Sequence, residues 1–439
     1  MPAFLPFVPF PLFTDWLFWL LIVAVALYAR YCASRPHLAV PWKRVFQSKA
    51  AVISSVVLAV FVVIGFLDSL HYRPRLQGSE AHYSPEVLSV LDLALSHLRE
   101  RRERTYSAPL ATRLYAKEQM QAEGKTVRDF PRLRHGGSHL KDEADFAFDV
   151  GWRIAAGLAL AFLAFLVLRK LGTAGLTFAA ILAIALPVGF LAHGYHVFGT
   201  DKVGQDVLYQ SLKSIRISLI IGTLTTLVLL PLGIALGIMA GYFKGWIDDV
   251  IQYVYTTLNS IPGVLLIAAA VLMMQVVIDR NADWFATAAQ RADFRLLILC
   301  AILGLTSWTG LARLLRGEAL KLSQLEYIQA AHAFGVADAR ILGRHILPNV
   351  AHIVIIAMVM DFSGLVLAEA VLSYVGVGVD PATTSFGTMI NAARLEMGRE
   401  PIVWWSLAAA FAFMFVLVLA ANLFADAVRD GFDPRVRMA

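Results

Sequence analysis

The sequence predicts an all-α polytopic membrane protein with about nine transmembrane helices. Hydrophobic residues make up 58% of the chain and charged residues only 16%, and its mean hydropathy is +0.66. A soluble globular chain carries about 25% charged residues, so a bilayer is the better solvent for this one. A hydrocarbon core of about 30 Å needs roughly 20 apolar residues as a helix. The stretches that reach or approach this length are 15–30, 50–68, 152–168, 173–192, 214–240, 258–278, 295–313, 353–375 and 402–425.

The first stretch, 15–30, follows an opening segment, MPAFLPFVPF, that contains no Lys or Arg. A secretory signal peptide has basic residues at this position, so we expect a retained helix rather than a cleaved leader. Together with the basic loop behind it, this helix forms a predicted N-terminal extension, 1–49, ahead of the second span at 50–68.

Lys and Arg residues outside the spans predict the orientation of the chain. They gather between the first two spans, inside the hairpin 152–192, after the seventh span and after the ninth: Arg30, Arg35, Lys43, Arg44, Lys49, Arg169, Lys170, Arg313, Arg316, Lys321, Arg340, Arg344, Arg429, Arg435 and Arg437. With nine spans all four groups face one side, which is then cytoplasmic, so the N-terminus is periplasmic and the C-terminus cytoplasmic. The net charge of +6 is explained in the same way. Membrane lipid is therefore the expected surrounding, and no nucleic-acid partner is expected.

A charged segment, 69–151, separates the second span from the hairpin. Residues 71–150 hold 13 basic and 12 acidic residues, and the parity of the spans makes this segment periplasmic. Ser84-Pro85-Glu86 predicts the start of an amphipathic helix. Leucines follow at helical spacing: Leu88, Leu91, Leu95 and Leu98. The charged run Arg99–Arg104 is interpreted as a solvated face with i,i+4 pairing, and a docking surface is the alternative.

A stretch after the seventh span carries the strongest functional signal. Leu325–Phe334 is a predicted helix whose small residues allow another surface to approach closely. Gly335 can end this helix in a left-handed cap. Asp338 can begin a second short helix, which Pro348 ends before the eighth span. From these residues alone, the element is either a lever or a connector.

The same stretch resembles the coupling loop of binding-protein-dependent ABC importer permeases, whose pattern is EAA, three residues, Gly, nine residues and I-x-L-P. Gln329 stands in place of the first Glu of that pattern and His345 in place of its Ile. Both departures resemble the oligopeptide/dipeptide branch. In that family the helix docks in a groove of the ATPase subunit, which implies the same role for residues 326–348. The residues to which the resemblance gives this role are Glu326, Gln329, Ala330, Ala331, Gly335, Leu347 and Pro348.

Two further stretches resemble the same branch. Residues 198–206 are similar to its periplasmic GTD-x-x-G-R-D element, with Gln205 in place of Arg, and Lys213-Ser214 stands where Tyr-Gly is usual. Residues 368–387 are similar to its E-x-x-L-S-F-L-G-L-G segment, which leads into a loop that faces the binding protein. The matching residues of the first element are Gly199, Thr200, Asp201, Gly204 and Asp206.

The resemblance, which covers about 43–68 and 195–437, also implies an architecture and a set of partners. Six helices, 50–68 and those within 214–425, would form an ABC type I importer permease core, with a coupling loop at 314–350 in the region 193–439. The implied partners are a second homologous permease, one or two ATPase subunits that hold ATP and magnesium, and a periplasmic substrate-binding protein. The implied function is translocation of peptides or peptide-like solutes across the inner membrane. Nickel or another small solute is the alternative cargo.

No motif indicates that the chain is an enzyme or binds a cofactor, since the sequence contains no HExxH, GxSxG or Walker lysine pattern. A rival class is a stand-alone secondary transporter, which would need intramembrane charges along several spans and an internal repeat. Away from the ends of the spans we find only Asp361 and Glu369, two turns apart on one helix face. They are candidates for lining the pathway or for a structural hydrogen bond.

Two smaller patterns leave alternatives open. Gly233, Gly237 and Gly241 form a GxxxGxxxG motif, which allows close helix packing within this chain or against a second permease. His193 and His196 have the i,i+3 spacing that can chelate a metal, but no third ligand is evident, so no metal site is predicted.

Overall fold

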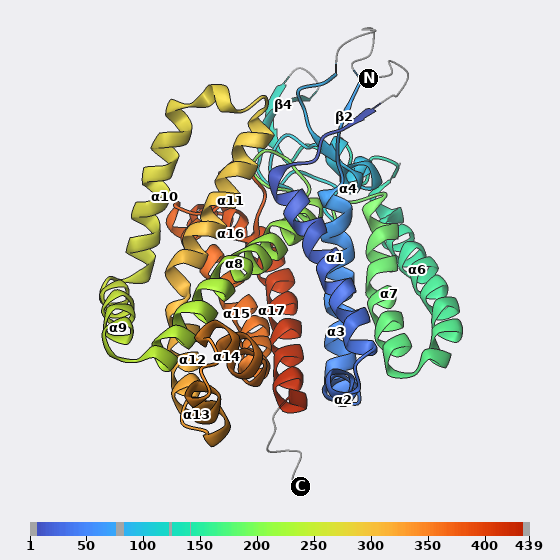
Figure 1. Cartoon of the computed structure of the whole chain (residues 1–439). Helices are drawn as coiled ribbons and strands as arrows, with labels where there is room; N and C mark the ends of the chain where they lie inside the picture. The colour runs from blue at the N-terminus through green and yellow to red at the C-terminus, as the bar shows by residue number, and fades with distance from the viewer. Residues whose placement is uncertain (1–6, 76–82, 123–124, 141, 433–439) are drawn as a thin grey trace. The chain divides into compact units, whose positions relative to one another are not determined.

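The computed structural model describes residues 7–75, 83–122, 125–140 and 142–432, and long helices dominate it (Figure 1). The predicted all-α membrane fold is confirmed. The helices are α1 (Phe13–Ala33), α2 (Pro36–Val45), α3 (Lys49–Ser69), α4 (Val90–Ala94), α5 (Ser96–Glu100), α6 (Phe146–Leu168), α7 (Gly172–Ala192), α8 (Val207–Phe243), α9 (Gly245–Ser260), α10 (Gly263–Arg280), α11 (Ala288–Ser307), α12 (Thr309–Leu322), α13 (Glu326–Ala333), α14 (Asp338–Ile341), α15 (Leu347–Val375), α16 (Phe386–Glu396) and α17 (Trp405–Phe432). The strands are β1 (Phe7–Pro9), β2 (His71–Pro74), β3 (Leu88–Ser89), β4 (Glu118–Ala122) and β5 (Lys125–Asp129).

Eight segments of the described residues are long and apolar enough to cross a membrane. One of them, Phe146–Ala192, consists of the two helices α6 and α7, so the predicted hairpin is present. The two helices pack closely because Gly157 of α6 faces the backbone of Pro187 on α7. The predicted span 258–278 begins later than expected, at Gly263, because the residue before Pro262 has an extended backbone and ends α9.

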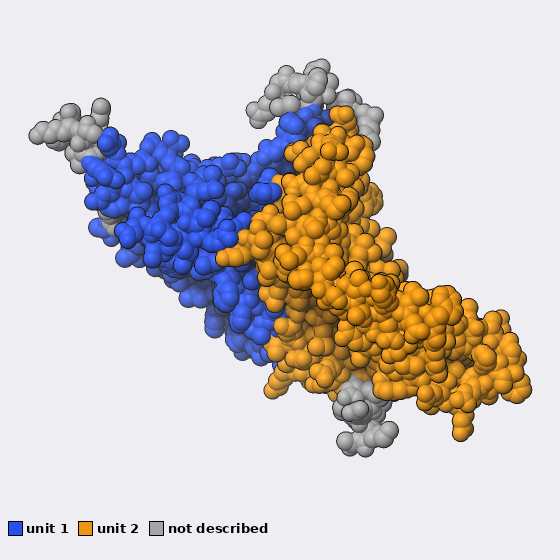
Figure 2. All heavy atoms as spheres, turned by 90° about the vertical axis from the view of Figure 1, so that its left-hand side faces the viewer, with its two compact units in different colours: residues 1–12, 52–218, 381–420 blue, residues 13–51, 219–380, 421–439 orange. Residues whose placement is uncertain are grey.

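The chain forms two compact units, which Figure 2 shows in different colours. Unit 1 comprises residues 1–12, 52–218 and 381–420, and unit 2 comprises residues 13–51, 219–380 and 421–439. Three of the boundaries between the units fall inside the long helices α3, α8 and α17, so each unit contains parts of membrane-spanning helices.

Unit 2 contains the first helix of the chain and the stretch that resembles a coupling loop. Helix α1 is attached to α11 by hydrogen bonds, because the carboxylate of Asp293 accepts one from the backbone N–H of Thr14 (2.9 Å) and another from the Thr14 hydroxyl. A buried apolar cluster joins α8, α12, α13 and α15.

Unit 1 contains most of the charged segment, which folds against the ends of its helices. Strands β1, β2 and β3 form an antiparallel sheet with Val8 opposite Arg73 and Tyr72 opposite Leu88, and β4 and β5 form a hairpin. The sequence did not predict these strands. We call residues 70–145 the inserted segment.

The predicted helix start at Ser84 is wrong. Leu88 pairs with Tyr72 in the sheet, and Ser89 is the residue that caps a helix. The Ser89 hydroxyl accepts from the backbone N–H of Asp92, whose carboxylate accepts from the backbone N–H of Ser89 in return. Two short helices, α4 and α5, therefore replace the single amphipathic helix, although the leucine spacing did mark two buried positions, Leu91 and Leu98.

Candidate functional site

The candidate site of unit 2 is the coupling segment, residues 325–348, which includes α13 at the lower end of Figure 1. Ile328 anchors α13 and is only 2% exposed. It belongs to a cluster with Leu315 of α12, Ile341 of α14 and Ile346, all of which are fully buried. One face of α13 therefore packs tightly against the neighbouring helices, and we call these buried residues (Leu315, Ile328, Ile341 and Ile346) the buried base.

Gly335 ends α13 in the way the sequence predicts, with a φ of +72°. The backbone N–H of Gly335 donates to the carbonyl of His332 (3.0 Å), and that of Val336 donates to the carbonyl of Ala331 (3.1 Å). These two bonds form a Schellman motif, which satisfies the last carbonyls of the helix and turns the chain back. Val336 and Ala331 then both pack against the buried base.

The other face of the coupling segment is exposed and apolar at its end. Phe334 is 88% exposed, directly before the turn. Glu326, Gln329 and Ala330 are exposed on α13 as well. Other large exposed apolar side chains of the segment are Leu325, Tyr327 and Leu347. Several such side chains within one short segment indicate a surface that a partner covers.

Pro348 does not end the second short helix, which corrects the expectation from the sequence. Residues 342–346 form a π-helical turn that links α14 to α15, and Pro348 lies in the first turn of α15. Proline has no N–H to donate, and the wider turn accommodates this without a break in the helical path. Helix α14, the π-turn and α15 therefore form one continuous helical path.

Helix α9 is joined to α12, the helix that precedes the coupling segment, by an ion pair. The guanidinium of Arg316 donates two hydrogen bonds to the carboxylate of Asp248, both at 2.6 Å. These hydrogen bonds hold the pKa of the Asp248 carboxyl below its usual value. Tyr242, at the end of α8, donates to Asp338 at the start of α14 (2.7 Å). The coupling segment is thus connected to α8 by a hydrogen bond and to α12 by packing, and α12 is in turn tied to α9.

The glycine motif of α8 packs within this chain. A Cβ atom added at Gly237 would lie 2.6 Å from the carbonyl oxygen of Ala312, and one added at Gly241 would lie 2.5 Å from that of Arg316. Gly233 faces the side chain of Leu311 in the same way. The motif therefore allows α8 and α12 to approach to backbone contact.

The two acidic residues of α15 have different surroundings. Glu369 is 1% exposed and accepts a hydrogen bond from the Ser373 hydroxyl at 2.7 Å. Asp361 is partly buried, two turns earlier on the same helix. The hydrogen bond gives Glu369 a structural contact, and a place on the solute pathway stays a prediction for both residues.

In unit 1, the element that resembles GTD-x-x-G-R-D is a tight loop before α8. Asp206 caps this helix, since its Oδ1 accepts from the backbone N–H groups of Leu208 (2.8 Å) and Tyr209 (3.2 Å). Asp201 closes the loop and accepts from Nε2 of Gln210 (2.7 Å). Both carboxylates are thus used to shape the start of α8.

The remaining residues of this element hold the inserted segment. Thr200 is fully buried, and its hydroxyl accepts a hydrogen bond from the backbone N–H of Ser107 at 2.7 Å. Gly204 has a φ of +73°, and a Cβ atom there would lie 1.9 Å from the carbonyl oxygen of Glu103. Gly199 approaches the carbonyl of Ser107 similarly, at 2.4 Å for an added Cβ. Glycine is required at both positions by backbone proximity.

Glu103 belongs to the run Arg99–Arg104, whose interpretation as a fully solvated face is wrong at this position. It is 6% exposed, and its carboxylate accepts three hydrogen bonds from the backbone N–H groups of residues 134–136, at 2.8, 2.7 and 3.0 Å. His196 lies between two carboxylates, with Nδ1 2.7 Å from Asp206 and Nε2 3.5 Å from Glu103. Burial opposes its charge, but the two carboxylates prevail and raise the pKa of His196 to about 9.

A second group of buried charges lies nearby in unit 1. The ammonium group of Lys213 is 2.9 Å from Asp68 of α3 and 2.9 Å from Asp92 of α4. Tyr209 donates to Asp92 (2.6 Å), and Ser89 donates to Asp68 (2.6 Å). This group ties the inserted segment to two membrane helices, α3 and α8, and sequence reasoning missed it. The one signal was Lys213 itself, at a position where the resemblance led us to expect Tyr.

Neither histidine of the i,i+3 pair has a metal-like arrangement. Among residues that the structure describes, no group of three or more His, Cys, Asp or Glu side chains is placed to hold a metal ion. His196 is occupied by the two carboxylates, and His193 stacks on His97 with ring centroids 4.5 Å apart.

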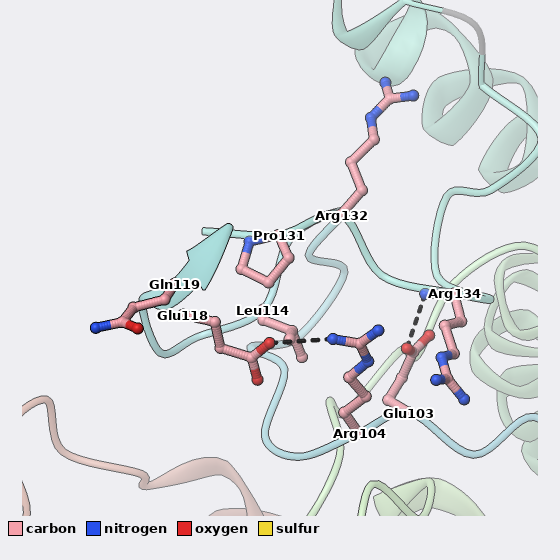
Figure 3. Close-up of a pocket in the computed structure, with 8 residues that line it drawn as sticks. All are labelled: Glu103, Arg104, Leu114, Glu118, Gln119, Pro131, Arg132 and Arg134. Atoms are coloured by element: carbon pink, nitrogen blue, oxygen red, sulfur yellow. Dashed lines mark hydrogen bonds and ion pairs between the residues drawn. The ribbon is translucent and has the colours of Figure 1, made fainter. Parts of the chain in front are cut away.

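The inserted segment also contains a polar pocket of about 450 Å³, shown in Figure 3. Arg104 pairs with Glu118 at 3.2 Å, and Glu103 receives the backbone N–H of Arg134. The lining residues are Glu103, Arg104, Leu114, Glu118, Gln119, Pro131, Arg132 and Arg134. Three guanidinium groups against two carboxylates make the pocket net positive, which suits an acidic partner surface.

Comparison with known proteins adds a family to this geometry. Residues 233–438 match the model of a family described as "Binding-protein-dependent transport system inner membrane component". The chain is 34% identical over 244 residues to the glutathione transport system permease protein GsiD of Pectobacterium atrosepticum, which covers 55% of this chain and 73% of that protein. It is 31% identical over 240 residues to the dipeptide transport system permease protein DppC of Lactococcus lactis (55% and 64%). With the oligopeptide transport system permease protein OppC of Mycobacterium tuberculosis it shares 30% identity over 242 residues (55% and 77%).

Proposed function

Because the chain belongs to the family of binding-protein-dependent transport system inner membrane components, we propose that it is the permease subunit of an ATP-driven importer for peptides or peptide-like solutes. The choice of cargo is supported by the named cargoes of three relatives, which are glutathione, dipeptides and oligopeptides. The chain is a multi-pass protein of the inner membrane. In the orientation we propose, the N-terminus is periplasmic and the C-terminus and coupling segment are cytoplasmic.

The observation that carries this proposal is the exposed apolar end of α13 on a buried base. Phe334 would enter a groove of a partner ATPase, while Ile328 holds α13 to the helices behind it. ATP with magnesium would be bound and hydrolysed by that partner, and this chain would perform no catalysis. Closure of the ATPases would displace α13, and the packed base would transmit the displacement to α12 and α15 as one body.

The remaining partners follow from the same assignment. A second homologous permease would complete the pathway, and one or two ATPase subunits would be present. A periplasmic substrate-binding protein would dock on the side of the inserted segment, whose net positive pocket offers guanidinium groups to acidic residues of that protein.

The first experiment is affinity purification of the tagged chain in mild detergent, with mass spectrometry of the proteins recovered. We expect a second permease and one or two ATPases in stoichiometric amounts. The variant Phe334→Ala should lower ATPase recovery by about tenfold or more, as loss of an interface anchor does. Phe148→Ala is the matched control, because Phe148 is also an exposed phenylalanine (80%) but belongs to α6 of unit 1 and not to the coupling segment.

Two results would overturn the proposal. The first is recovery of this chain alone, with solute uptake that continues when ATP is removed. The second is a Phe334→Ala variant that retains the ATPase as well as Phe148→Ala does, which would reject the coupling role of α13.

A further inference from the structure

Unit 1 contains an apolar cavity of about 550 Å³ that solute transport does not explain. It is bounded by α3, α5, α7, α8 and α17, and all of its lining side chains are apolar except those of His97 and His193. Representative lining residues are Val60, Phe61, Ile184, Val188, Phe413 and Val416. Figure 1 shows α7 between α6 and α3, so the hairpin forms one wall of the cavity.

The cavity extends through about half of a bilayer. Its lining on α7 runs from Ile181 to His193, and at 1.5 Å per residue these positions are about 18 Å apart along the helix. The hydrocarbon core is about 30 Å thick, so one leaflet is roughly 15 Å deep. The cavity thus reaches from the middle of the membrane to the level of the lipid headgroups, on the side of the inserted segment.

The end of the cavity at headgroup level is polar and lies beside the positive charge of Arg101. The Nδ1–H group of His193 donates to the carbonyl of Gly189 (3.0 Å), which leaves Nε2 directed elsewhere, and the ring stacks on His97. The guanidinium of Arg101 donates to the carbonyl of His193. Burial, together with the neighbouring His193 and Arg101, lowers the pKa of His97, and an anion at this place would relieve that repulsion. Asp206 is the carboxylate that also acts on His97, and its own contacts are with His196 and the start of α8.

We propose that this cavity binds one acyl chain of a phospholipid, with the lipid phosphate held by Arg101, His97 and His193. The lipid belongs to the leaflet next to the inserted segment. An acyl chain needs no hydrogen bonds, whereas a peptide in the same place would leave its amides unpaired against this lining. The bound lipid would join the hairpin α6–α7, which lies outside the resemblance to the permease core, to the core helices α3 and α17.

The test uses the full chain in nanodiscs of phosphatidylethanolamine and phosphatidylglycerol that contain a phosphatidylglycerol with a diazirine in its acyl chain. After illumination, labelled peptides are mapped by mass spectrometry. We expect labels to concentrate on the cavity faces of α7 and α17. Gly189→Trp should fill the cavity without a clash, because a Cβ atom added there meets nothing within 4 Å. Labelling at these faces should fall by about tenfold or more, since losing even about two buried methylenes has that effect.

Gly151→Trp is the matched control, because Gly151 of α6 is equally open but does not line the cavity. Arg101→Gln should reduce labelling as well, through the headgroup. Equal labelling in Gly189→Trp and Gly151→Trp, or labels spread evenly over the exposed faces of α1 and α6, would mean only general lipid contact and would overturn the proposal. Cross-links from the cavity to another protein subunit would overturn it too, by assigning the cavity to a protein helix.

Discussion

Glu103 gives the sharpest test of how the inserted segment is held in unit 1. Its side chain is 1% exposed, accepts the backbone N–H groups of residues 134–136 and lies 3.5 Å from Nε2 of His196. Burial raises the pKa of Glu103, but these hydrogen bonds outweigh it and lower that pKa to about 2. The change Glu103→Gln retains the shape and one acceptor oxygen. It removes the charge and one acceptor, next to a buried imidazolium.

The size of the effect follows from the same contacts. A pKa of about 2 against an ordinary value of 4.5 corresponds to about 3 kcal/mol of native-state stabilisation. Hydrogen bonds to a charged acceptor contribute about 1.5–3 kcal/mol each, which gives a similar magnitude for the loss of one. We therefore expect the local opening of the inserted segment to become about a hundredfold more frequent in Glu103→Gln.

Hydrogen exchange in nanodiscs at neutral pH measures this opening at the amides of residues 134–136. The control is Glu100→Gln, since Glu100 is exposed in the same charged run. Exchange should accelerate about a hundredfold in Glu103→Gln and stay unchanged in Glu100→Gln. Equal exchange in both variants and the unmodified chain would refute the reasoning that this buried carboxylate holds the segment.

Three further predictions address other contacts. The pKa of His196 rises from 6.5 to about 9 on folding, so its stabilising contribution is complete below pH 6.5 and is lost as pH rises through about 9. The protection factors of amides in the loop before α8, which are corrected for the intrinsic pH dependence of exchange, should fall over that window and stay constant in His196→Gln. Gly237→Leu should destabilise the contact of α8 with α12 by about 3 kcal/mol, because its Cβ would lie 2.6 Å from the carbonyl oxygen of Ala312. Thermal unfolding in detergent measures this loss. Gly310→Leu is the control, since a Cβ atom added at Gly310 meets nothing within 4 Å. Gly335→Pro should abolish ATP-dependent uptake while membrane insertion persists, since proline cannot adopt a φ of +72°, whereas Gly335→Asn should retain most uptake because Asn tolerates that backbone.

Local chemistry made much of the fold predictable. Apolar runs predicted the spans because only a helix of that length satisfies its backbone in a bilayer. Gly335 was predictable since a left-handed cap favours glycine, and the structure has it there with positive φ. Pro348 was wrongly predicted to end a helix, because a proline is compatible with more than one local structure. A proline pattern indicates a missing N–H but not whether the helix ends or, as here, widens into a π-turn at residues 342–346.

Buried charge pairs were not predictable in this way, because their partners are distant in the chain. Lys213 contacts Asp92 across 121 positions of sequence. Glu103 appeared to belong to a solvated run, because its neighbours are arginines and hydrophilicity says nothing about which member of a run turns inward. The three backbone N–H groups that it accepts come from a loop about 30 residues later, which carries no composition signal of its own.

These contacts decide how the inserted segment should be tested. The inserted segment supplies two carboxylates that pair with cations outside it. Asp92 contacts Lys213, and Glu103 contacts His196. Deletion of the segment would leave both cations buried or half-buried with fewer carboxylates, at a cost of several kcal/mol. Loss of uptake after deletion would then report misfolding rather than a failure to dock a binding protein. Charge reversal at exposed Arg132, in the pocket of Figure 3, would alter the proposed docking surface and leave the buried pairs intact, so it would separate the two explanations.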